Sequence, residues 1–168
     1  MKIIFLDVDG VLNSKTFLES RTSRNKHRTP KDHLDPQQVK RLQKIVDNTG
    51  AKIVVSSTWR YGTMFRELLD ALKHHGFTGE IIGRTKTDSC SDCLRGNQIL
   101  RWVRDHVKDY HRFGDYVILD DDSDMLYWQK DNFVHTSWET GLTDKDVDLA
   151  INILNTKSFP ANTRVKLP

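Results

Sequence analysis

Short runs of apolar residues alternate along the chain with longer segments in which apolar residues recur every three or four positions. The runs predict buried strands, and the spaced residues predict the inward faces of helices. We expect strands at residues 2–7, 52–56, 80–82, 116–120 and 133–134. We expect helices at residues 35–50, 64–76, 96–110 and 143–154, and a short helix through 125–128. This alternation predicts an α/β protein with a Rossmann-like three-layer fold, in which helices cover both faces of a mainly parallel five-stranded sheet.

Three segments lack such a pattern. Residues 13–34 are polar and basic, and we expect a long loop there. A polar loop is expected at 84–94, and residues 157–168 predict an extended surface tail. Because neither a repeat nor a domain boundary is visible, residues 1–168 are expected to form a single domain.

The composition fits a soluble globular protein. Hydrophobic residues make up 37% of the 168 residues and charged residues 29%, which is too apolar for a disordered chain. No apolar run approaches the roughly 20 residues that a membrane helix needs. The apolar start is also too short for a signal peptide, so we expect a cytoplasmic protein.

The positive charge is concentrated in one stretch. Six basic and three acidic side chains lie between Asn13 and Asp35, an excess equal to the net charge of +3. The basic residues are Lys15, Arg21, Arg24, Lys26, Arg28 and Lys31. Such a stretch could contact the phosphate backbone of a nucleic acid. The alternative is a solvated flap whose charge only aids solubility.

Two cysteines, Cys90 and Cys93, have a Cys-x-x-Cys spacing. The pair is at best half of a zinc site, which His74 and His75 could complete. Two reduced thiols are the favoured interpretation.

Three of the expected strands end in groups that could handle a metal and a phosphate. The first ends in Asp-Val-Asp-Gly at 7–10, the second in Ser-Ser-Thr at 56–58, and the fourth in three aspartates at 120–122. Ligands bind at the carboxyl ends of parallel strands, so these groups would converge if the strands are neighbours. Clustered carboxylates repel one another without a cation, and their oxygens suit Mg²⁺. The alternative is that these acids are solvated turn residues.

These segments resemble the motifs of phosphatases of the haloacid dehalogenase (HAD) superfamily. Asp-Val-Asp-Gly-Val-Leu at 7–12 is similar to the first motif, Val-Val-Ser at 54–56 to the second, and Val-Ile-Leu-Asp-Asp at 117–121 to the fourth. The third motif is a single Lys or Arg. For it we favour Arg95, with Lys86 and Arg84 as alternatives.

The resemblance implies a role for each motif residue. Asp7 would attack phosphorus and form an aspartyl-phosphate, and Asp9 would act as general acid and then as general base. Asp7, the backbone carbonyl of Asp9, and Asp121 would hold Mg²⁺. Ser56, Ser57 and Arg95 would bind the phosphoryl group, and Asp120 would support the site from behind. An acid at position 9 favours a phosphatase over the ATPases and dehalogenases of the superfamily.

The substrate is inferred from two further features. The short stretch between the first two motifs leaves no room for a large cap domain, so we expect an open site that suits a nucleic-acid end. Residues 118–121 with 125–128 resemble the phosphatase domain of phage polynucleotide kinase/phosphatases. Residues 56–60 and 141–143 resemble the small phosphatase domains of multifunctional RNA-repair proteins. The expected activity is therefore that of a polynucleotide phosphatase.

Other interpretations stay open. The chain could be a small-molecule phosphatase such as a nucleotidase, or a non-catalytic module that binds Mg²⁺ and phosphate. Exposed aromatic residues could stack on bases. We expect instead that Trp59, Trp102, Trp128 and Trp138 lie in the core.

Overall fold

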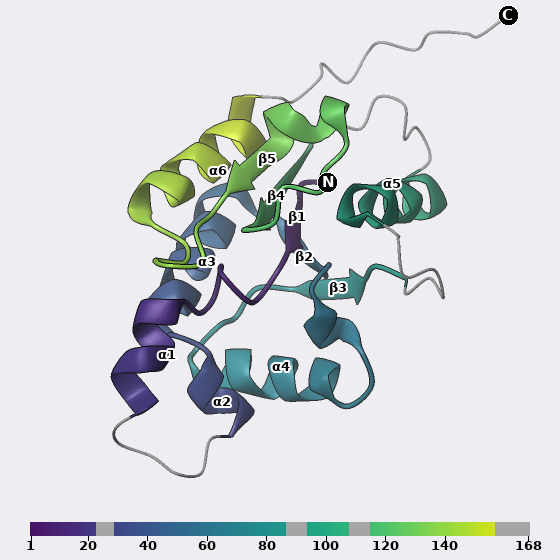
Figure 1. The fold of residues 1–168 in the computed structure, drawn as a ribbon. Helices are drawn as coiled ribbons and strands as arrows, with labels where there is room; N and C mark the ends of the chain where they lie inside the picture. Colours follow the sequence, from purple (N-terminus) through teal and green to yellow (C-terminus); the bar gives the residue numbers. More distant parts are fainter. Residues whose placement is uncertain (23–28, 87–93, 108–114, 157–168) are drawn as a thin grey trace, which may run out of the picture.

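A computed structural model describes residues 1–22, 29–86, 94–107 and 115–156. It contains one five-stranded sheet in the order β3-β2-β1-β4-β5, and every pair of neighbouring strands is parallel (Figure 1). The strands are β1 (Ile3–Leu6), β2 (Lys52–Val55), β3 (Ile81–Arg84), β4 (Tyr116–Asp120) and β5 (Phe133–His135). The expected α/β fold with a parallel sheet is confirmed.

Helices cover both faces of this sheet. The main ones are α3 (Pro36–Thr49), α4 (Met64–His74), α5 (Arg95–His106) and α6 (Asp144–Thr156). Side chains of β1 alternate between two cores: Ile4 and Leu6 pack with α3, α4 and α6, whereas Ile3 and Phe5 pack with α5. Figure 1 shows α5 on one side of the sheet and α3 and α6 on the other. The alternation follows from the two-residue period of a strand.

The expected loop at 13–34 is wrong where the structure describes it. Helix α1 (Lys15–Thr22) follows Ser14, whose Oγ accepts a hydrogen bond from the backbone N–H of Phe17 at 3.2 Å. Helix α2 (Pro30–His33) starts with a capping box, in which both the backbone N–H and the hydroxyl of Thr29 donate to Asp32. These short helices have few apolar residues and so show no periodic stripe, but their caps were visible in the sequence.

Smaller expectations also changed. The short helix expected through 125–128 is a 3₁₀ helix, η3 (Tyr127–Asn132), and a second one, η1 (Thr58–Arg60), follows β2. Trp59 and Trp102 are buried as expected, but Trp128 and Trp138 are 63% and 42% exposed, so their core assignment was wrong.

Several expectations fall outside the described residues. They concern the tail at 157–168, the end of the helix predicted to reach residue 110, and most of the loop predicted at 84–94. Cys90 and Cys93, half of the suggested zinc site, also lie outside the described residues. Its other two candidates, His74 and His75, lie at the end of α4 with their ring centroids 5.0 Å apart. Among the described residues, no helix is long and apolar enough to cross a membrane.

Candidate active site

The acidic strand ends meet where the order of the sheet reverses. From β1 the chain continues to β2 and β3 on one side, whereas β4 and β5 lie on the other. Asp7 follows β1, Asp120 ends β4 and Ser56 follows β2. The backbone hydrogen bonds of the sheet extend to Asp7 and Ser56. Asp7 donates its N–H to the carbonyl of Leu119, and Ser56 donates its N–H to the carbonyl of Leu6, each at 2.9 Å. Such a reversal is the usual place for a ligand in an open α/β sheet.

Three carboxylates gather at this edge. Asp7, Asp120 and Asp121 each place one oxygen within 4.8 Å of the others. Oδ2 of Asp120 is buried and accepts no hydrogen bond from the described residues. Carboxylate oxygens at this separation are the kind of ligand that a hard divalent cation binds. The cluster can therefore hold a divalent metal.

Gly10 makes the approach of Asp121 possible. It has a φ of 70°, and a Cβ at this position would lie 2.2 Å from Cγ of Asp121. The carbonyl of Gly10 accepts a hydrogen bond from the Thr136 hydroxyl at 2.7 Å, which fixes this turn to the end of β5. Only glycine allows both the backbone conformation and the close contact.

Arg95 lies between two of the carboxylates. Its Nη2 is 3.3 Å from Oδ1 of Asp7, and its Nε is 3.3 Å from Oδ2 of Asp120. The arginine side chain is only 11% exposed. Its backbone N–H donates to Oδ2 of Asp124 at 2.8 Å, which fixes the start of α5 at the site. Nη1 of Arg95 is buried without a hydrogen-bond partner among the described residues, so it retains a donor for an anion.

The two alternative cations are engaged elsewhere. Lys86 forms a 2.7 Å ion pair with Asp105. The guanidinium of Arg84 lies over the ring of Phe65 and donates to the carbonyl of Arg60. Among the three candidates, within the part of the chain that the structure describes, Arg95 is the one in contact with Asp7.

Burial controls the ionisation of the cluster. It raises the pKa of Asp7 to about 6, although Arg95 and a hydrogen bond from Ser57 act against this rise. Burial, together with the charge of Asp7, raises the pKa of Asp120 to about 8 against the opposing effect of Arg95. The pKa of Asp121 is raised as well, first by burial and then by Asp122. One arginine does not offset the desolvation of these carboxylates, which is the situation that a bound cation relieves.

The two serines differ in their surroundings. Oγ of Ser56 is buried and has no hydrogen-bond partner within the described ranges, so it is available to a ligand. The hydroxyl of Ser57 instead bonds to Asp7. Below them the buried guanidinium of Arg60 donates to the carbonyls of Ser56 and Ser57, at 2.8 and 2.6 Å. This support by Arg60 was not predicted from the sequence.

Asp9 stands apart from the acidic cluster. Its carboxylate accepts hydrogen bonds from Nδ2 of Asn13 at 2.7 Å and from Nε1 of Trp59 at 3.0 Å. The resemblance implies a metal contact through the backbone carbonyl of Asp9 only, so the carboxylate is not needed as a metal ligand. Neither Asn13 nor Trp59 was expected at the site. Trp59 is 50 residues from Asp9 in the sequence, and the direction of the nearby Asn13 side chain depends on the turn after β1.

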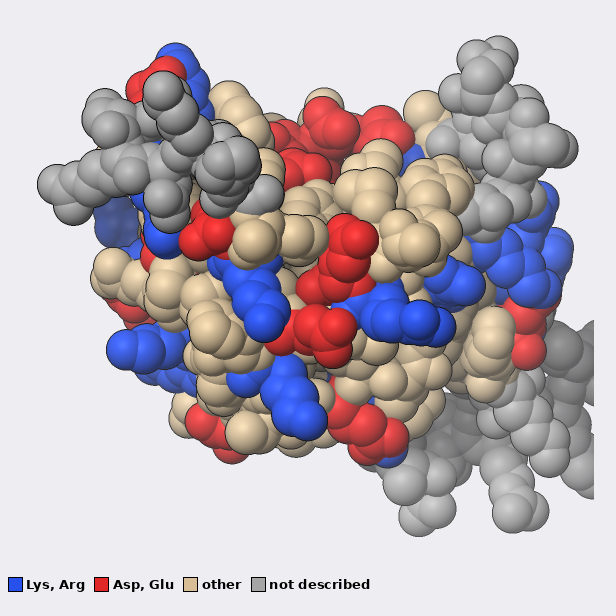
Figure 2. All heavy atoms as spheres, turned by 90° about the horizontal axis from the view of Figure 1, so that it is seen from below, with Lys and Arg blue, Asp and Glu red and all other residues tan. Residues whose placement is uncertain are grey.

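The basic residues are only partly available. Lys15 pairs with Glu139 at 2.9 Å and Arg21 with Asp32 at 3.3 Å, while Lys31 is exposed. Arg24, Lys26 and Arg28 lie outside the described residues. On the face seen in Figure 2, blue basic and red acidic side chains are interspersed and do not form a field of one sign.

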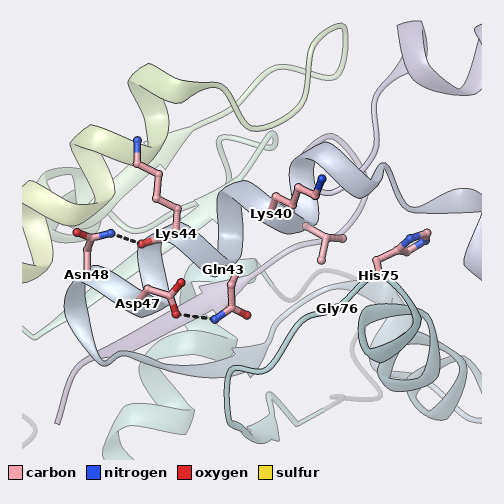
Figure 3. Close-up of a pocket in the computed structure, with 8 residues that line it drawn as sticks. Lys40, Gln43, Lys44, Asp47, Asn48, His75 and Gly76 are labelled. Carbon is pink, nitrogen blue, oxygen red and sulfur yellow. Dashed lines mark hydrogen bonds between the residues drawn. The ribbon is translucent and has the colours of Figure 1, made fainter.

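A surface hollow lies away from the strand ends. Figure 3 shows that α3 and the end of α4 line it, with Lys40, Lys44 and His75 at its border. Gln43 and Asn48 are already engaged there, with Asp47 and with the carbonyl of Lys44. It contains none of the residues expected to bind Mg²⁺ or a phosphoryl group.

The Asp-x-Asp turn, the acidic end of β4 and the buried arginine on this sheet define a phosphatase-type domain of the HAD superfamily. Residues 3–147 match the family model described as the HAD domain in Swiss Army Knife RNA repair proteins, and the chain belongs to this family. The likeness expected from the sequence is confirmed. Searches of curated proteins and of solved structures found no match.

Proposed function

We propose that this protein is a Mg²⁺-dependent phosphomonoesterase that removes phosphate from nucleic-acid ends through an aspartyl-phosphate at Asp7. The observation that carries the proposal is the pairing of Asp7 with Arg95 at 3.3 Å, beside further carboxylates able to hold a metal. An attacking carboxylate and a phosphate dianion repel each other, so such a site needs positive charge close to the nucleophile.

The reaction would take two steps. An oxygen of Asp7 attacks phosphorus, the ester bond to the leaving oxygen breaks, and Asp9 gives its proton to that oxygen. A water molecule then attacks phosphorus, Asp9 takes the proton of the water, and the bond from phosphorus to Asp7 breaks to release phosphate. Two steps through a covalent intermediate have lower barriers than one direct hydrolysis.

Other side chains would stabilise the phosphoryl group. Nη1 of Arg95 and Oγ of Ser56 are buried at the site and have no hydrogen-bond partner within the described ranges, and both can donate to a phosphoryl oxygen. Ser57 holds Asp7 by its hydroxyl. The carboxylates of Asp7 and Asp121 and the backbone carbonyl of Asp9 would hold Mg²⁺, with Asp120 behind them. When bound, Mg²⁺ supplies charge neutralisation at the phosphoryl oxygens.

Two observations support a nucleic-acid end as substrate. The family is that of RNA-repair proteins, and the described residues between β1 and α3 form the short helices α1 and α2, where a large cap would stand. The ion pairs of Lys15 and Arg21 favour the second candidate, a small-molecule phosphatase, because paired cations contribute less to binding a phosphate backbone.

A direct assay tests the proposal. Phosphate release is measured from oligonucleotides with 3′ or 5′ phosphates, from mononucleotides and from an aryl phosphate, with Mg²⁺ or with chelator. We expect Mg²⁺-dependent release with the lowest KM for an oligonucleotide. Asp7→Asn should abolish turnover and keep the fold, because the amide has nearly the same shape but is not nucleophilic. Asp70→Asn, an exposed change on α4, is the matched control. Wild-type turnover by Asp7→Asn, or full activity in chelator, would contradict the mechanism.

A further inference from the structure

Both oxygens of the Asp9 carboxylate are held by side chains. Oδ1 accepts from Nδ2 of Asn13 at 2.7 Å, and Oδ2 accepts from the indole Nε1–H of Trp59 at 3.0 Å. Asn13 is fully buried and Trp59 is 7% exposed. Oδ1 of Asn13 in turn accepts from the N–H of Gly10 at 3.0 Å. Two donors from different turns therefore fix the plane of this carboxylate.

We propose that Trp59 is a positioning residue, which orients Asp9 for proton transfer to the leaving oxygen. This inference rests on the proposed function of Asp9 as general acid. An indole N–H can only donate, so Oδ2 can only act as an acceptor in this contact. A rigid ring aims its donor better than a long flexible side chain does. Proton transfer is effective only within hydrogen-bond reach, and a displacement of about 1 Å can cost about 10²-fold in rate.

Trp59 also connects Asp9 to the nucleophile. Its backbone N–H donates to Oγ of Ser57 at 3.3 Å, and the Ser57 hydroxyl bonds to Asp7. Trp59 thus contacts Asp9 directly through its ring and contacts Ser57, which supports Asp7, through its backbone. Because Trp59 belongs to η1, directly after β2, its position is set by the end of a central strand.

The ring of Trp59 is itself held in place. Arg60 anchors the preceding turn through the carbonyls of Ser56 and Ser57. The imidazole of His33, on α2, meets the indole edge to face with ring centroids 6.2 Å apart. Asp9 is therefore oriented by a packed side chain, whereas a loosely held donor would allow the carboxylate to turn away.

The competing explanation is that Asp9 merely satisfies a buried indole donor. Buried Trp N–H groups usually find a partner, so the hydrogen bond alone does not decide. The two explanations differ in what the contact affects. A satisfied donor contributes to stability, whereas a positioning donor affects the step in which the leaving oxygen takes its proton. That step depends on the pKa of the leaving group.

The test compares leaving groups in Trp59→Phe, which keeps an aromatic ring but removes the N–H. The rate of phosphoryl transfer to Asp7 is measured in single turnovers, with an alkyl phosphate such as a nucleotide end and with an aryl phosphate. We expect the alkyl rate to fall by about 10- to 100-fold and the aryl rate by much less, because a phenolate leaves without protonation. Trp102→Phe, the same change at a buried Trp of α5, should leave the ratio of the two rates unchanged.

Asp9→Asn separates this inference from the proposed function. If Asp9→Asn lowers the alkyl rate selectively but Trp59→Phe lowers both rates equally or neither, Asp9 is the acid and Trp59 does not position it. If Asp9→Asn shows no selectivity, the acid role itself fails, and the inference fails with it. Should Trp59→Phe not fold, replacing Trp59 by its benzothiophene analogue retains the shape and removes only the N–H. Wild-type selectivity in that protein would overturn the inference.

Discussion

Asp7 is a carboxylate on which the effect of burial outweighs the effect of its hydrogen-bond and ion-pair partners. Burial, Asp9 and Asp121 disfavour its charge, while Arg95 and Ser57 favour it, and the result is a pKa of about 6. A nucleophile must be ionised, and with this pKa most Asp7 side chains are ionised near neutral pH before a metal binds. The further carboxylate, Asp120, keeps its proton to higher pH because it is buried and because Asp7 is charged beside it. We infer that positive charge from a metal would complete the ionisation of the pair.

Gly10 allows a sharp test at the level of one residue. Gly10→Ala would force a Cβ to within 2.2 Å of Cγ of Asp121, so Asp121 must move. We expect turnover to fall and the Mg²⁺ concentration for half-maximal activity to rise, as measured by titration with the metal. Gly50→Ala is the matched control: it has a similar φ of 66°, but no described atom lies within 4 Å of its added Cβ. It should lower stability by about 1 kcal/mol and keep the metal dependence. Equal metal dependence in both variants would contradict this role for Gly10.

The sequence identifies some site residues and misses others for a physical reason. Asp7, Ser56 and Asp121 follow buried strands, and the carboxyl ends of parallel strands must meet at one edge. Asn13, Trp59 and Arg60 act across turns, and their side-chain directions depend on packing that no spacing encodes. For the third motif the sequence favoured Arg95 but left Lys86 and Arg84 as alternatives, because these cations also lie in the region where the motif was expected.

At the level of elements, α1 and α2 were hidden by their composition. Phe17 and Leu18 are the only large apolar residues of α1, and both are half-buried, so no stripe of apolar residues indicates a helix. By contrast α3 was predictable, since Asp35 caps its first turn and Gly50 ends it with a left-handed conformation. Helices that pack into the core have a sequence period, and helices at the surface depend on their caps.

The six basic residues between Asn13 and Asp35 provide a prediction at the level of elements. Replacing Lys15, Arg21, Arg24, Lys26, Arg28 and Lys31 by Gln should raise the KM for a phosphorylated oligonucleotide and barely change it for a mononucleotide, which presents no neighbouring phosphates. The oligonucleotide KM should also rise with salt, less steeply in the variant, by about 0.7 in the log–log slope for each lost contact. Lys31→Gln alone should act more than Lys15→Gln, because Lys15 is paired with Glu139. KM values insensitive to salt and to these changes would favour a small-molecule phosphatase.

The contact between α3 and α6 gives a second prediction for elements. Arg41 binds Asp144 with two hydrogen bonds, at 3.2 and 2.8 Å, and also donates to the carbonyl of Leu142. We expect Arg41→Gln to lower the free energy of unfolding by about 1 kcal/mol without changing kcat. Lys44→Gln, which removes a longer and more exposed pair with Asp148 at 3.7 Å, should have almost no effect. Chemical denaturation of both variants measures this, and equal losses would show that the bidentate geometry contributes nothing.

For the whole molecule, the sequence predicted the layers but not the strand order. Alternating strands and helices require a parallel sheet with helices on both faces, whatever the order. The order depends on which side of β1 each crossover returns to, and β4 lies beside β1 although most of the chain separates them. That neighbourhood brings Asp120 and Asp121 to Asp7. The sequence therefore predicted that the site residues converge only if their strands are neighbours, and the strand order of the structure meets this condition.

The stability of the whole molecule should depend on pH through this cluster. In the folded metal-free protein the pKa of Asp7 is raised from 3.8 to about 6 and that of Asp120 to about 8. A raised carboxyl pKa stabilises the fold below the unfolded value, and this contribution is lost as pH rises through the folded value. The thermal midpoint of the metal-free protein should therefore fall between pH 5 and pH 8, a window chosen to lie above the ordinary carboxyl pKa and to reach the value for Asp120.

Asp120→Asn and Mg²⁺ identify the origin of that slope. The variant lacks the titrating group at 120, so its midpoint should fall less between the same two pH values. Mg²⁺ should raise the wild-type midpoint most at pH 8, where the carboxylates are ionised, and a hundredfold excess over Kd contributes about 2.7 kcal/mol. Thermal unfolding at both pH values, with Mg²⁺ and with chelator, measures each effect. If the midpoints of wild type and Asp120→Asn fall equally, Asp120 does not titrate in this range. If Mg²⁺ shifts neither midpoint, the acidic cluster does not bind the metal.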